Sequence, residues 1–579
     1  MDDRVLLAIF LSILIIITYQ YFFMPRPVVQ KKPLGEKEEI VIEEKGLGDS
    51  EFQDEGLNGL IEIQKARKQE NVRIETGKYI AEVTNNGGCL KSWKLKEYTQ
   101  EKRYETWPLK KAFWIQVLQS YKRVLGLKHD DVENEVRGLV ELIPENDKGI
   151  KTLPLDITLI SEIGGKEVFG EGFYEIRTDE YIDANKGIQP SVILSYLDDR
   201  GILIGKEIRF FENEYKLGID ITMKNISGRD QAVDYALCWG PGIGRNMEQE
   251  GHHRFEGPVF WINGKKVRIK PKKIKEPVIK EGSLEWVGYE KTYFGAAIIP
   301  ENTSAEAVVF RRGAAEGEED AIIVGAKYPL RVITAGGQIR DSYEVYIGPK
   351  RKEDLIGVAG HFVEIIDYGW FSFLAKPLIW FLKWVYRYIP NYGIAIVLLT
   401  IIIKILFWPL TEKSFGSMQA MQKIQPKMAA LREKYKGDPT RMNKEIMDLY
   451  KKHGVNPLGG CLPMILQIPV FFALYEGLLV AIEMRGAPFF LWIQDLSAMD
   501  PLLITPVLMG ITMYMQQKMM PTGMDPKQAK MMNLMPIIFT VFFLGFPSGL
   551  VIYWLLNNVL TIGHQYLIHK RTLQASEAC

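Results

Sequence analysis

The sequence has almost no net charge, few cysteines and none of the common nucleotide-, zinc- or serine-enzyme motifs. Lysine and arginine number 72 against 71 aspartates and glutamates, so the overall charge does not indicate a nucleic-acid partner. The four cysteines, Cys89, Cys238, Cys461 and Cys579, show no CxxC or Cys/His spacing, and whether Cys89 and Cys238 pair is left open. No Walker, GxSxG or HExxH motif occurs. We therefore predict no cofactor, no metal site and no catalytic residue.

The even overall charge hides a strong asymmetry along the chain. Residues 30–350 are polar and charged, whereas residues 1–25 and 370–570 are rich in isoleucine, leucine, phenylalanine, methionine and tryptophan. This pattern predicts a membrane protein with one large water-soluble domain.

The first 25 residues contain an uncharged run, from Val5 to Phe23. Nineteen helical residues span about 28 Å, close to one bilayer core. No small-residue cleavage site follows, so a retained N-terminal anchor (1–25) is favoured over a cleaved signal peptide. The charged stretch 26–70, with few apolar clusters, is predicted to be a flexible tether.

Residues 71–349 alternate short β-prone runs with glycine and asparagine turns, as in YIAEVT and SYEVYIG. Many short strands with regular turns predict an antiparallel β-sandwich. The segment EGHHRFEG (250–257) has two histidines, but neighbours on an extended chain point to opposite faces. A polar loop is therefore favoured there over a metal site.

Residues 367–389 combine aromatic side chains at helical spacing with interspersed lysine and arginine. This composition favours an amphipathic helix lying in the membrane interface, although a helix closing the β-domain is an alternative. Pro377 is expected to kink or divide it.

The remaining chain predicts a helical membrane core of five transmembrane helices, in addition to the N-terminal anchor. The predicted segments are transmembrane helix 2 (391–410), a cytoplasmic helical hairpin (411–457), transmembrane helix 3 (462–482), transmembrane helix 4 (502–518), transmembrane helix 5 (534–546), transmembrane helix 6 (549–568) and a short tail (569–579). Pro409 is expected to end transmembrane helix 2. In the hairpin, Gly437 precedes Asp438 as N-cap and Pro439 as first helical residue.

Basic residues predict the orientation of these helices. The loop 411–457 carries ten lysines and arginines, whereas the loop 483–501 carries only Arg485. By the positive-inside rule, the hairpin and the C-terminus are cytoplasmic, and the β-domain lies on the outer side of the membrane. The N-terminus is then cytoplasmic, although the flanks of the first helix argue weakly the other way.

One lysine, Lys404, stands within the apolar run of transmembrane helix 2, about 10 Å from its cytoplasmic end. A snorkelling lysine on a lipid-facing surface is one interpretation. The other is a lysine facing a hydrated hollow between helices, since a charge inside a membrane helix is a functional-site candidate. Polar residues that would line such a hollow are Thr400, Gln467, Gln516, Asn557 and Asn558. No carboxylate lies at comparable depth in these predicted spans.

Long motifs in the C-terminal half resemble the YidC membrane protein insertase family. They are FWPLT (407–411), NPLGGCLPMILQIPVFFALYEGL (456–478), APFFLWIQDLSAMDP (487–501) and FTVFFLGFPSGLVIYW (539–554), and WVGYEKTYFGAAIIP (286–300) is a looser match. The anchor and the large β-domain resemble the Gram-negative form, whose periplasmic domain is a supersandwich-like β-fold.

The resemblance implies a hydrophilic groove, open to the cytoplasm and to lipid, that takes in nascent membrane segments. Lys404 matches the groove cation, which is commonly arginine in the family, so bidentate hydrogen bonding is lost. Other matching groove or substrate-contact positions are Thr400, Phe471, Met509, Phe542 and Trp554. The implied partners are nascent membrane proteins, lipids and the Sec translocon with its accessory subunits. Ribosome contact is weakly supported, because the tail after Ile568 is short.

Three functions remain to be distinguished. The leading one is an insertase and chaperone of the bacterial inner membrane, which is not an enzyme. The alternative is a transporter or channel using Lys404 as an anion site, although intramembrane carboxylates and repeat symmetry are not evident. A third is a membrane-tethered sugar-processing enzyme acting through the β-domain.

Overall fold

The structure is a computed structural model that describes residues 68–99, 139–144, 153–159, 172–183, 187–244, 255–312, 321–435, 437–454, 462–519 and 526–577. The predicted anchor (1–25), nearly all of the tether and residues 250–254 of the predicted polar loop lie outside them. The chain divides into two compact units. One contains the described residues of 415–460 and 520–535, and the other contains the β-domain and the remaining helices.

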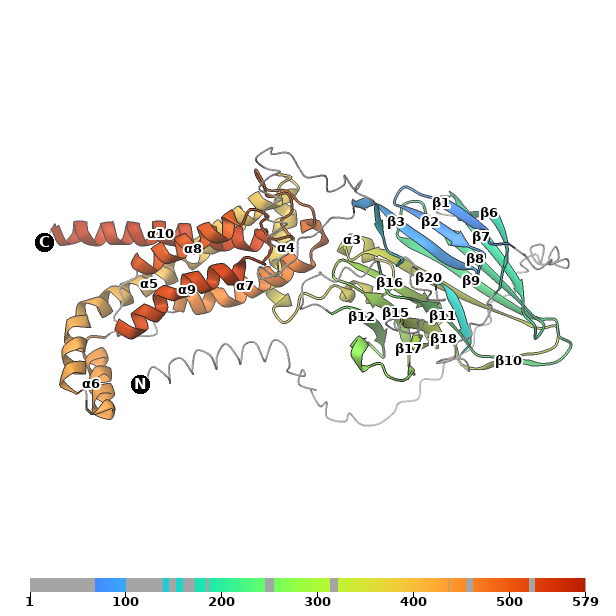
Figure 1. Ribbon diagram of the computed structural model, residues 1–579, viewed down its shortest axis with the longest axis horizontal. Helices are drawn as coiled ribbons and strands as arrows, with labels where there is room; N and C mark the ends of the chain where they lie inside the picture. Colours follow the sequence, from blue (N-terminus) through green and yellow to red (C-terminus); the bar gives the residue numbers. More distant parts are fainter. Residues whose placement is uncertain are drawn as a thin grey trace, which may run out of the picture. The chain divides into compact units, whose positions relative to one another are not determined.

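The strands of the β-domain form antiparallel sheets (Figure 1). The nine-stranded sheet has the order β13 (Lys265–Arg268), β12 (Gly257–Ile262), β15 (Leu284–Glu290), β16 (Phe294–Pro300), β20 (Gln338–Pro349), β9 (Lys216–Asn225), β8 (Ile202–Phe210), β7 (Gly187–Leu197) and β6 (Glu175–Asp183). The five-stranded sheet has the order β14 (Val278–Lys280), β17 (Glu306–Arg312), β18 (Ala321–Lys327), β11 (Tyr235–Trp239) and β5 (Asp156–Leu159). The smaller sheets are β1 (Asn71–Glu75), β2 (Tyr79–Thr84), β3 (Cys89–Thr99) and β4 (Leu139–Glu141), and β10 (Gln231–Val233) with β19 (Arg331–Ile333).

The two larger sheets pack against each other. Strands β15 and β16 of the nine-stranded sheet contact β18, and β16 also contacts β11 of the five-stranded sheet. Fully buried aromatic side chains, including Trp239, Trp286 and Tyr346, fill the core. The predicted sheet-rich domain followed by a helical C-terminal part is confirmed.

Cys89 and Cys238 are both buried and form no disulfide. The Cys89 thiol donates to the carbonyl of Gly87 (3.2 Å), and the Cys238 thiol donates to the carbonyl of Ala236 (3.7 Å). Both side chains lie in the core, where a cysteine behaves as a small apolar residue.

The described residues also contain four short helical turns, of which α3 and η3 connect the last strand to the helical part, and seven longer helices. The short elements are η2 (Pro271–Lys273), α3 (Lys352–Leu355), η3 (Phe362–Ile365) and η5 (Ile482–Met484). The longer helices are α4 (Ser372–Tyr386), α5 (Tyr392–Lys434), α6 (Pro439–Lys452), α7 (Leu462–Val480), α8 (Ile504–Met519), α9 (Pro526–Phe543) and α10 (Ser548–Glu577) (Figure 1). By length and composition, α5 alone among the described helices is long and apolar enough to cross a membrane; shorter apolar stretches are Ile465–Val480 and Asn533–Phe543.

Helix α4 has an apolar face against the helical core and an aromatic face that is exposed. Ile379 and Leu382 are buried, and α4 packs on α7, where Gly477 lets the backbone approach Ile379 closely. Trp380 is exposed on the other face, and Trp370, two residues before the helix, is exposed as well. The helix continues through Pro377, so the expected division there is wrong.

The expected end of transmembrane helix 2 at Pro409 is also wrong, because α5 continues unbroken to Lys434. A proline inside a helix removes one backbone hydrogen bond, and neighbouring hydroxyls often offset this loss. The carbonyl that Pro409 leaves without its helical donor is that of Ile405, whereas the Thr411 hydroxyl donates to the carbonyl of Phe407 at 2.8 Å. Likewise α10 extends to Glu577, so most of the predicted tail is helical.

The predicted cap of the second hairpin helix is confirmed. The Asp438 side chain accepts a hydrogen bond from the backbone N–H of Arg441 at 3.0 Å, and Pro439 begins α6. Ile424 and Met428 of α5 form a small apolar cluster with Leu449 and Tyr450 of α6.

We expect Asp438→Ala to destabilise α6 by about 1 kcal/mol, because the cap is lost and one backbone donor is left without its acceptor. Hydrogen exchange of the first turn of α6 in the detergent-solubilised protein measures this, as faster exchange confined to that turn. Asp438→Asn is the matched control, since asparagine caps equally well. Unchanged exchange in Asp438→Ala would show that the cap contributes nothing.

Candidate functional site

Lys404 lies on α5 and makes a hydrogen bond to α10. Its Nζ is 2.5 Å from the hydroxyl oxygen of Thr561. Thr561 in turn donates its hydroxyl proton to the backbone carbonyl of Asn557, at 2.6 Å. A threonine hydroxyl has one proton, so its oxygen acts as the acceptor toward the ammonium group.

The Lys404 ammonium is half-buried among apolar neighbours, and no ion pair involves it within the described part of the chain. The next two residues on α5, Ile405 and Leu406, are exposed. An ammonium group has three N–H donors, and the hydrogen bond to Thr561 uses one of them. The remaining donors are available to water or to polar groups of a bound molecule.

Helix α10 carries a row of buried polar side chains on the face that contains Thr561. The row consists of Asn557, Asn558, Thr561, His564 and Gln565. Asn558 donates to the carbonyl of Met509 on α8 (3.3 Å), and the His564 ring stacks on Trp408 of α5 at 3.8 Å between centroids. The buried polar row therefore faces both α5 and α8.

Two residues that the sequence assigned to the site, Phe471 on α7 and Trp554 on α10, lie against each other. Their rings meet edge to face, with centroids 5.0 Å apart. Phe543 of α9 completes the contact, 5.9 Å from Phe471 and 5.5 Å from Trp554. Such geometry suits the aromatic quadrupole and joins three helices in one aromatic cluster.

The other predicted polar residues have separate surroundings. Gln467 donates to the hydroxyl of Tyr553 on α10 at 3.4 Å, and Gln516 lies half-buried on α8. Thr400 is buried, and its hydroxyl donates to the carbonyl of Ile396 in its own helix at 2.7 Å. Thr400 thus shares a helix face with Lys404, but its hydroxyl proton is donated to the Ile396 carbonyl and is not available to another acceptor.

The two remaining predicted substrate-contact residues differ in exposure. Phe542 on α9 is 60% exposed, whereas Met509 on α8 is fully buried in the core of the helices. Phe542 is accessible as the structure stands. A contact from Met509 to a substrate requires α8 to move away from α10.

The sequence analysis missed Thr561 and His564. Threonine is common in membrane helices, and histidine was considered only as a metal ligand. Neither residue was therefore predicted to belong to the site. A signal was present, because the two residues follow Asn557 by four and seven positions, the spacing of one helix face.

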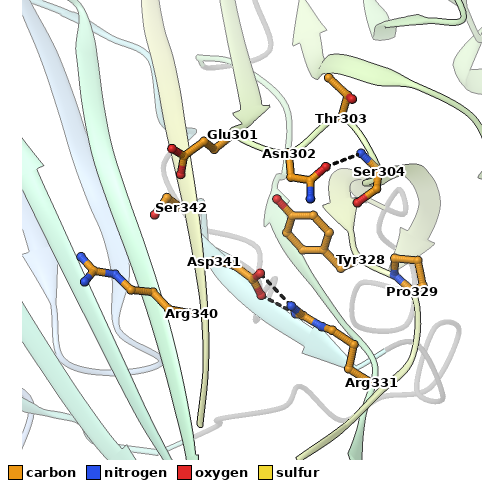
Figure 2. Close-up of a pocket in the computed structure, with 10 residues that line it drawn as sticks. All are labelled: Glu301, Asn302, Thr303, Ser304, Tyr328, Pro329, Arg331, Arg340, Asp341 and Ser342. Carbon is orange, nitrogen blue, oxygen red and sulfur yellow. Dashed lines mark hydrogen bonds and ion pairs between the residues drawn. The ribbon is translucent and has the colours of Figure 1, made fainter. Parts of the chain in front are cut away.

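The β-domain contains a polar hollow of about 780 Å³ between β20 and the loops after β16 and β18 (Figure 2). Three of its four charged lining residues are engaged in ion pairs. Asp341 accepts from Arg331 (2.8 Å to one oxygen), and Arg340 pairs with Asp220 (3.0 Å). Burial raises the pKa of Tyr235 well above its ordinary value, so its hydroxyl stays protonated and donates to Asp341.

These pairs bear on the third predicted function, a sugar-processing enzyme. Glycoside hydrolysis commonly requires two carboxyl groups that exchange protons with the substrate. Asp341 is held by Arg331 and Tyr235, which leaves Glu301 as the other carboxylate among the ten lining residues. The hollow thus has the polar character of a binding surface without a pair of carboxylates free for catalysis.

The fold and the site together define a helical membrane protein with a large β-domain and a charge inside its core. Residues 384–575 match the family described as 60Kd inner membrane protein, and residues 129–381 match the YidC periplasmic domain. A membrane protein insertase YidC of Syntrophus aciditrophicus (strain SB) is 36% identical, over 99% of this chain and 100% of its own length. A second membrane protein insertase YidC, from Geotalea uraniireducens (strain Rf4), is 46% identical over 64% of this chain and 69% of its own length.

A solved structure described as an active YidC insertase with its first transmembrane domain resolved is 19% identical. It covers 86% of this chain and 93% of its own chain, with a TM-score of 0.34. From the family matches and the full-length relatives, the chain belongs to the YidC family of membrane protein insertases. It is an inner-membrane protein with a periplasmic domain, and these relatives do not favour the alternative of a transporter or channel.

Proposed function

We propose that this insertase receives hydrated segments of nascent membrane proteins beside Lys404 and releases them into the lipid. The observation that carries the proposal is a half-buried ammonium group that donates a hydrogen bond to a hydroxyl, that of Thr561, rather than to a carboxylate. Such a charge lowers the cost of bringing polar or acidic groups partway into the bilayer. Partition of the substrate's apolar residues then drives insertion without an energy source.

The proposed groove is lined by Lys404, Thr400, Gln467, Gln516 and Trp554. Trp554 supports this through its contact with Phe471, because aromatic rings adapt to varied apolar segments. Phe471, Phe542 and Met509 are proposed to contact the substrate, with Met509 reached after movement of α8.

In the membrane, we place α5, α7, α8, α9 and α10 as five spans in addition to the N-terminal anchor. The basic residues of the hairpin (411–457) support a cytoplasmic hairpin and cytoplasmic termini. Helix α4 then lies in the periplasmic interface, with Trp370 and Trp380 at the level of the lipid headgroups. This topology puts Lys404 in the cytoplasmic half of its span.

The Sec translocon and its accessory subunits are proposed partners, in line with the family, for substrates that require both. The ribosome is proposed as a further partner, with less support than the Sec translocon. The chemistry at Lys404 requires neither partner, so we propose that short substrates insert by this protein alone.

Photocrosslinking tests the site of substrate contact. We expect a benzoylphenylalanine at position 471, replacing Phe471, to crosslink a ribosome-stalled nascent membrane segment. The same probe at Phe373 is the matched control, since Phe373 is an exposed phenylalanine on α4. Equal crosslinking from both positions, or none from position 471, would contradict a substrate path along α7 and α10.

A further inference from the structure

The hydrogen bond between Lys404 and Thr561 has a defined direction. The proton of the Thr561 hydroxyl is committed to the Asn557 carbonyl, at 2.6 Å. Its oxygen therefore presents lone pairs toward the Lys404 ammonium, 2.5 Å away. The backbone of α10 thus fixes the orientation of the Thr561 hydroxyl, independently of the Lys404 side chain.

A second contact, one turn further along both helices, holds the same register. Trp408 follows Lys404 by four residues and His564 follows Thr561 by three, and their rings stack with an angle of 24° between planes. Residues three or four apart lie on one face of a helix. Two contacts at successive turns therefore fix how the Lys404 face of α5 is turned toward α10.

A lysine needs such an anchor more than an arginine does. Its ammonium is a compact charge on a flexible four-carbon stem, whereas a guanidinium is planar and presents several donors in a rigid fork. A lysine stem in a membrane helix tends to extend toward the aqueous interface. The Thr561 oxygen offers the ammonium an acceptor within the helical core instead.

We infer that Thr561 is a positioning residue, which holds the Lys404 ammonium at the depth where it meets the translocated segment of the substrate. This inference rests on the proposed function of Lys404. One N–H is given to Thr561, and the others face the substrate. The substrates most dependent on Thr561 are those whose translocated segments carry carboxylates, because a charged acceptor strengthens the hydrogen bond to the ammonium.

The test uses two substrates that differ only in the translocated segment, which carries three aspartates or three asparagines. Full-length protein is reconstituted in liposomes, and insertion is measured by protease protection. Thr561→Val removes the hydroxyl at nearly constant shape and is expected to lower insertion of the aspartate substrate about fivefold, but of the asparagine substrate less than twofold. Thr561→Ser, which keeps the hydroxyl, is expected to stay within about twofold of the parent for both.

Thr540→Val is the matched control, because the Thr540 hydroxyl also donates to the carbonyl four residues earlier (Pro536, 2.7 Å) but on α9. It is expected to insert both substrates as the parent does. Thermal unfolding in detergent is recorded for each variant, and Thr561→Ala replaces the valine variant if the latter unfolds early. An equal loss of both substrates, or no loss in a folded variant without the hydroxyl, would overturn the positioning role.

Lys404→Gln separates this inference from the proposed function. If Lys404→Gln does not change the insertion of either substrate, the proposed role of Lys404 is wrong, and the inference about Thr561 is then wrong as well. If Lys404→Gln lowers insertion of the aspartate substrate and Thr561→Val does not, only the inference about Thr561 fails. In the double variant, we expect no loss beyond that of Lys404→Gln, because the hydroxyl acts through the ammonium.

Discussion

Replacing Lys404 by glutamate is expected to reduce the insertion of substrates with acidic translocated segments at least about tenfold. Attraction between the ammonium and substrate carboxylates becomes repulsion, and salt screens a partly buried site weakly. Substrates with neutral segments are expected to lose less, because only their dipoles are affected.

Reconstituted liposomes with purified variants provide the measurement. Lys404→Arg should keep most activity because it keeps the charge. Lys413→Glu is the control for charge reversal on the same helix, since Lys413 is exposed beyond the apolar part of α5. Normal insertion of acidic substrates by Lys404→Glu would rule out an electrostatic role for this position.

Replacing Glu290 by glutamine is expected to destabilise the protein by about 3–5 kcal/mol, since it removes one partner of a buried ionic cluster. Glu290 is fully buried on β15 and binds Arg268 at 2.5 Å and Lys350 at 3.2 Å. Arg268 also binds Asp367, just before α4. Without the Glu290 charge, Arg268 and the buried Lys350 lose the carboxylate they share.

Denaturant unfolding of the detergent-solubilised full chain measures this difference through tryptophan fluorescence. Glu82→Gln is the matched control, because Glu82 pairs with Lys91 at the surface and its loss should cost less than about 1 kcal/mol. Equal midpoints for the two variants would show that the buried cluster contributes no more than an exposed pair.

The cluster also has a defined dependence on pH. Burial raises the pKa of Asp367, but Arg268 and Lys266 outweigh this effect and lower it well below its usual range. A carboxyl group with a lowered pKa stabilises the folded state above its unfolded value of about 4, and this contribution is lost as pH falls toward the folded value. At neutral pH Asp367 is therefore ionised, and its pairing with Arg268 stabilises the folded state.

Sequence periodicity predicted the β-domain and the helical core because both rest on simple patterns. The run YIAEVT is β2 residue for residue, and the apolar stretches after residue 390 are helices. The errors arose at prolines. Pro377 and Pro409 lie inside continuous helices, because the loss of one backbone hydrogen bond does not end a helix that packs against its neighbours.

The candidate site was predictable only in part. Lys404 stood out because a charge in an apolar run is rare, and Phe471 and Trp554 were assigned through the family motifs. Thr561 was missed because its role depends on which helix faces α5, and sequence spacing within one helix says nothing of partners on another. The burial of Met509 likewise follows from the packing of α8 on α10.

The buried polar row of α10 has a consequence for the biogenesis of the protein itself. Asn557, Asn558, Thr561, His564 and Gln565 make α10 a poor membrane span on its own, and despite its length α10 does not qualify as one by composition. Thr561 accepts from Lys404 on α5 and Asn558 donates to Met509 on α8, and both of these helices precede α10 in the chain. We therefore expect α10 to become a stable span together with the helices on which it packs, so that this insertase has to accommodate a polar segment of its own chain as it folds.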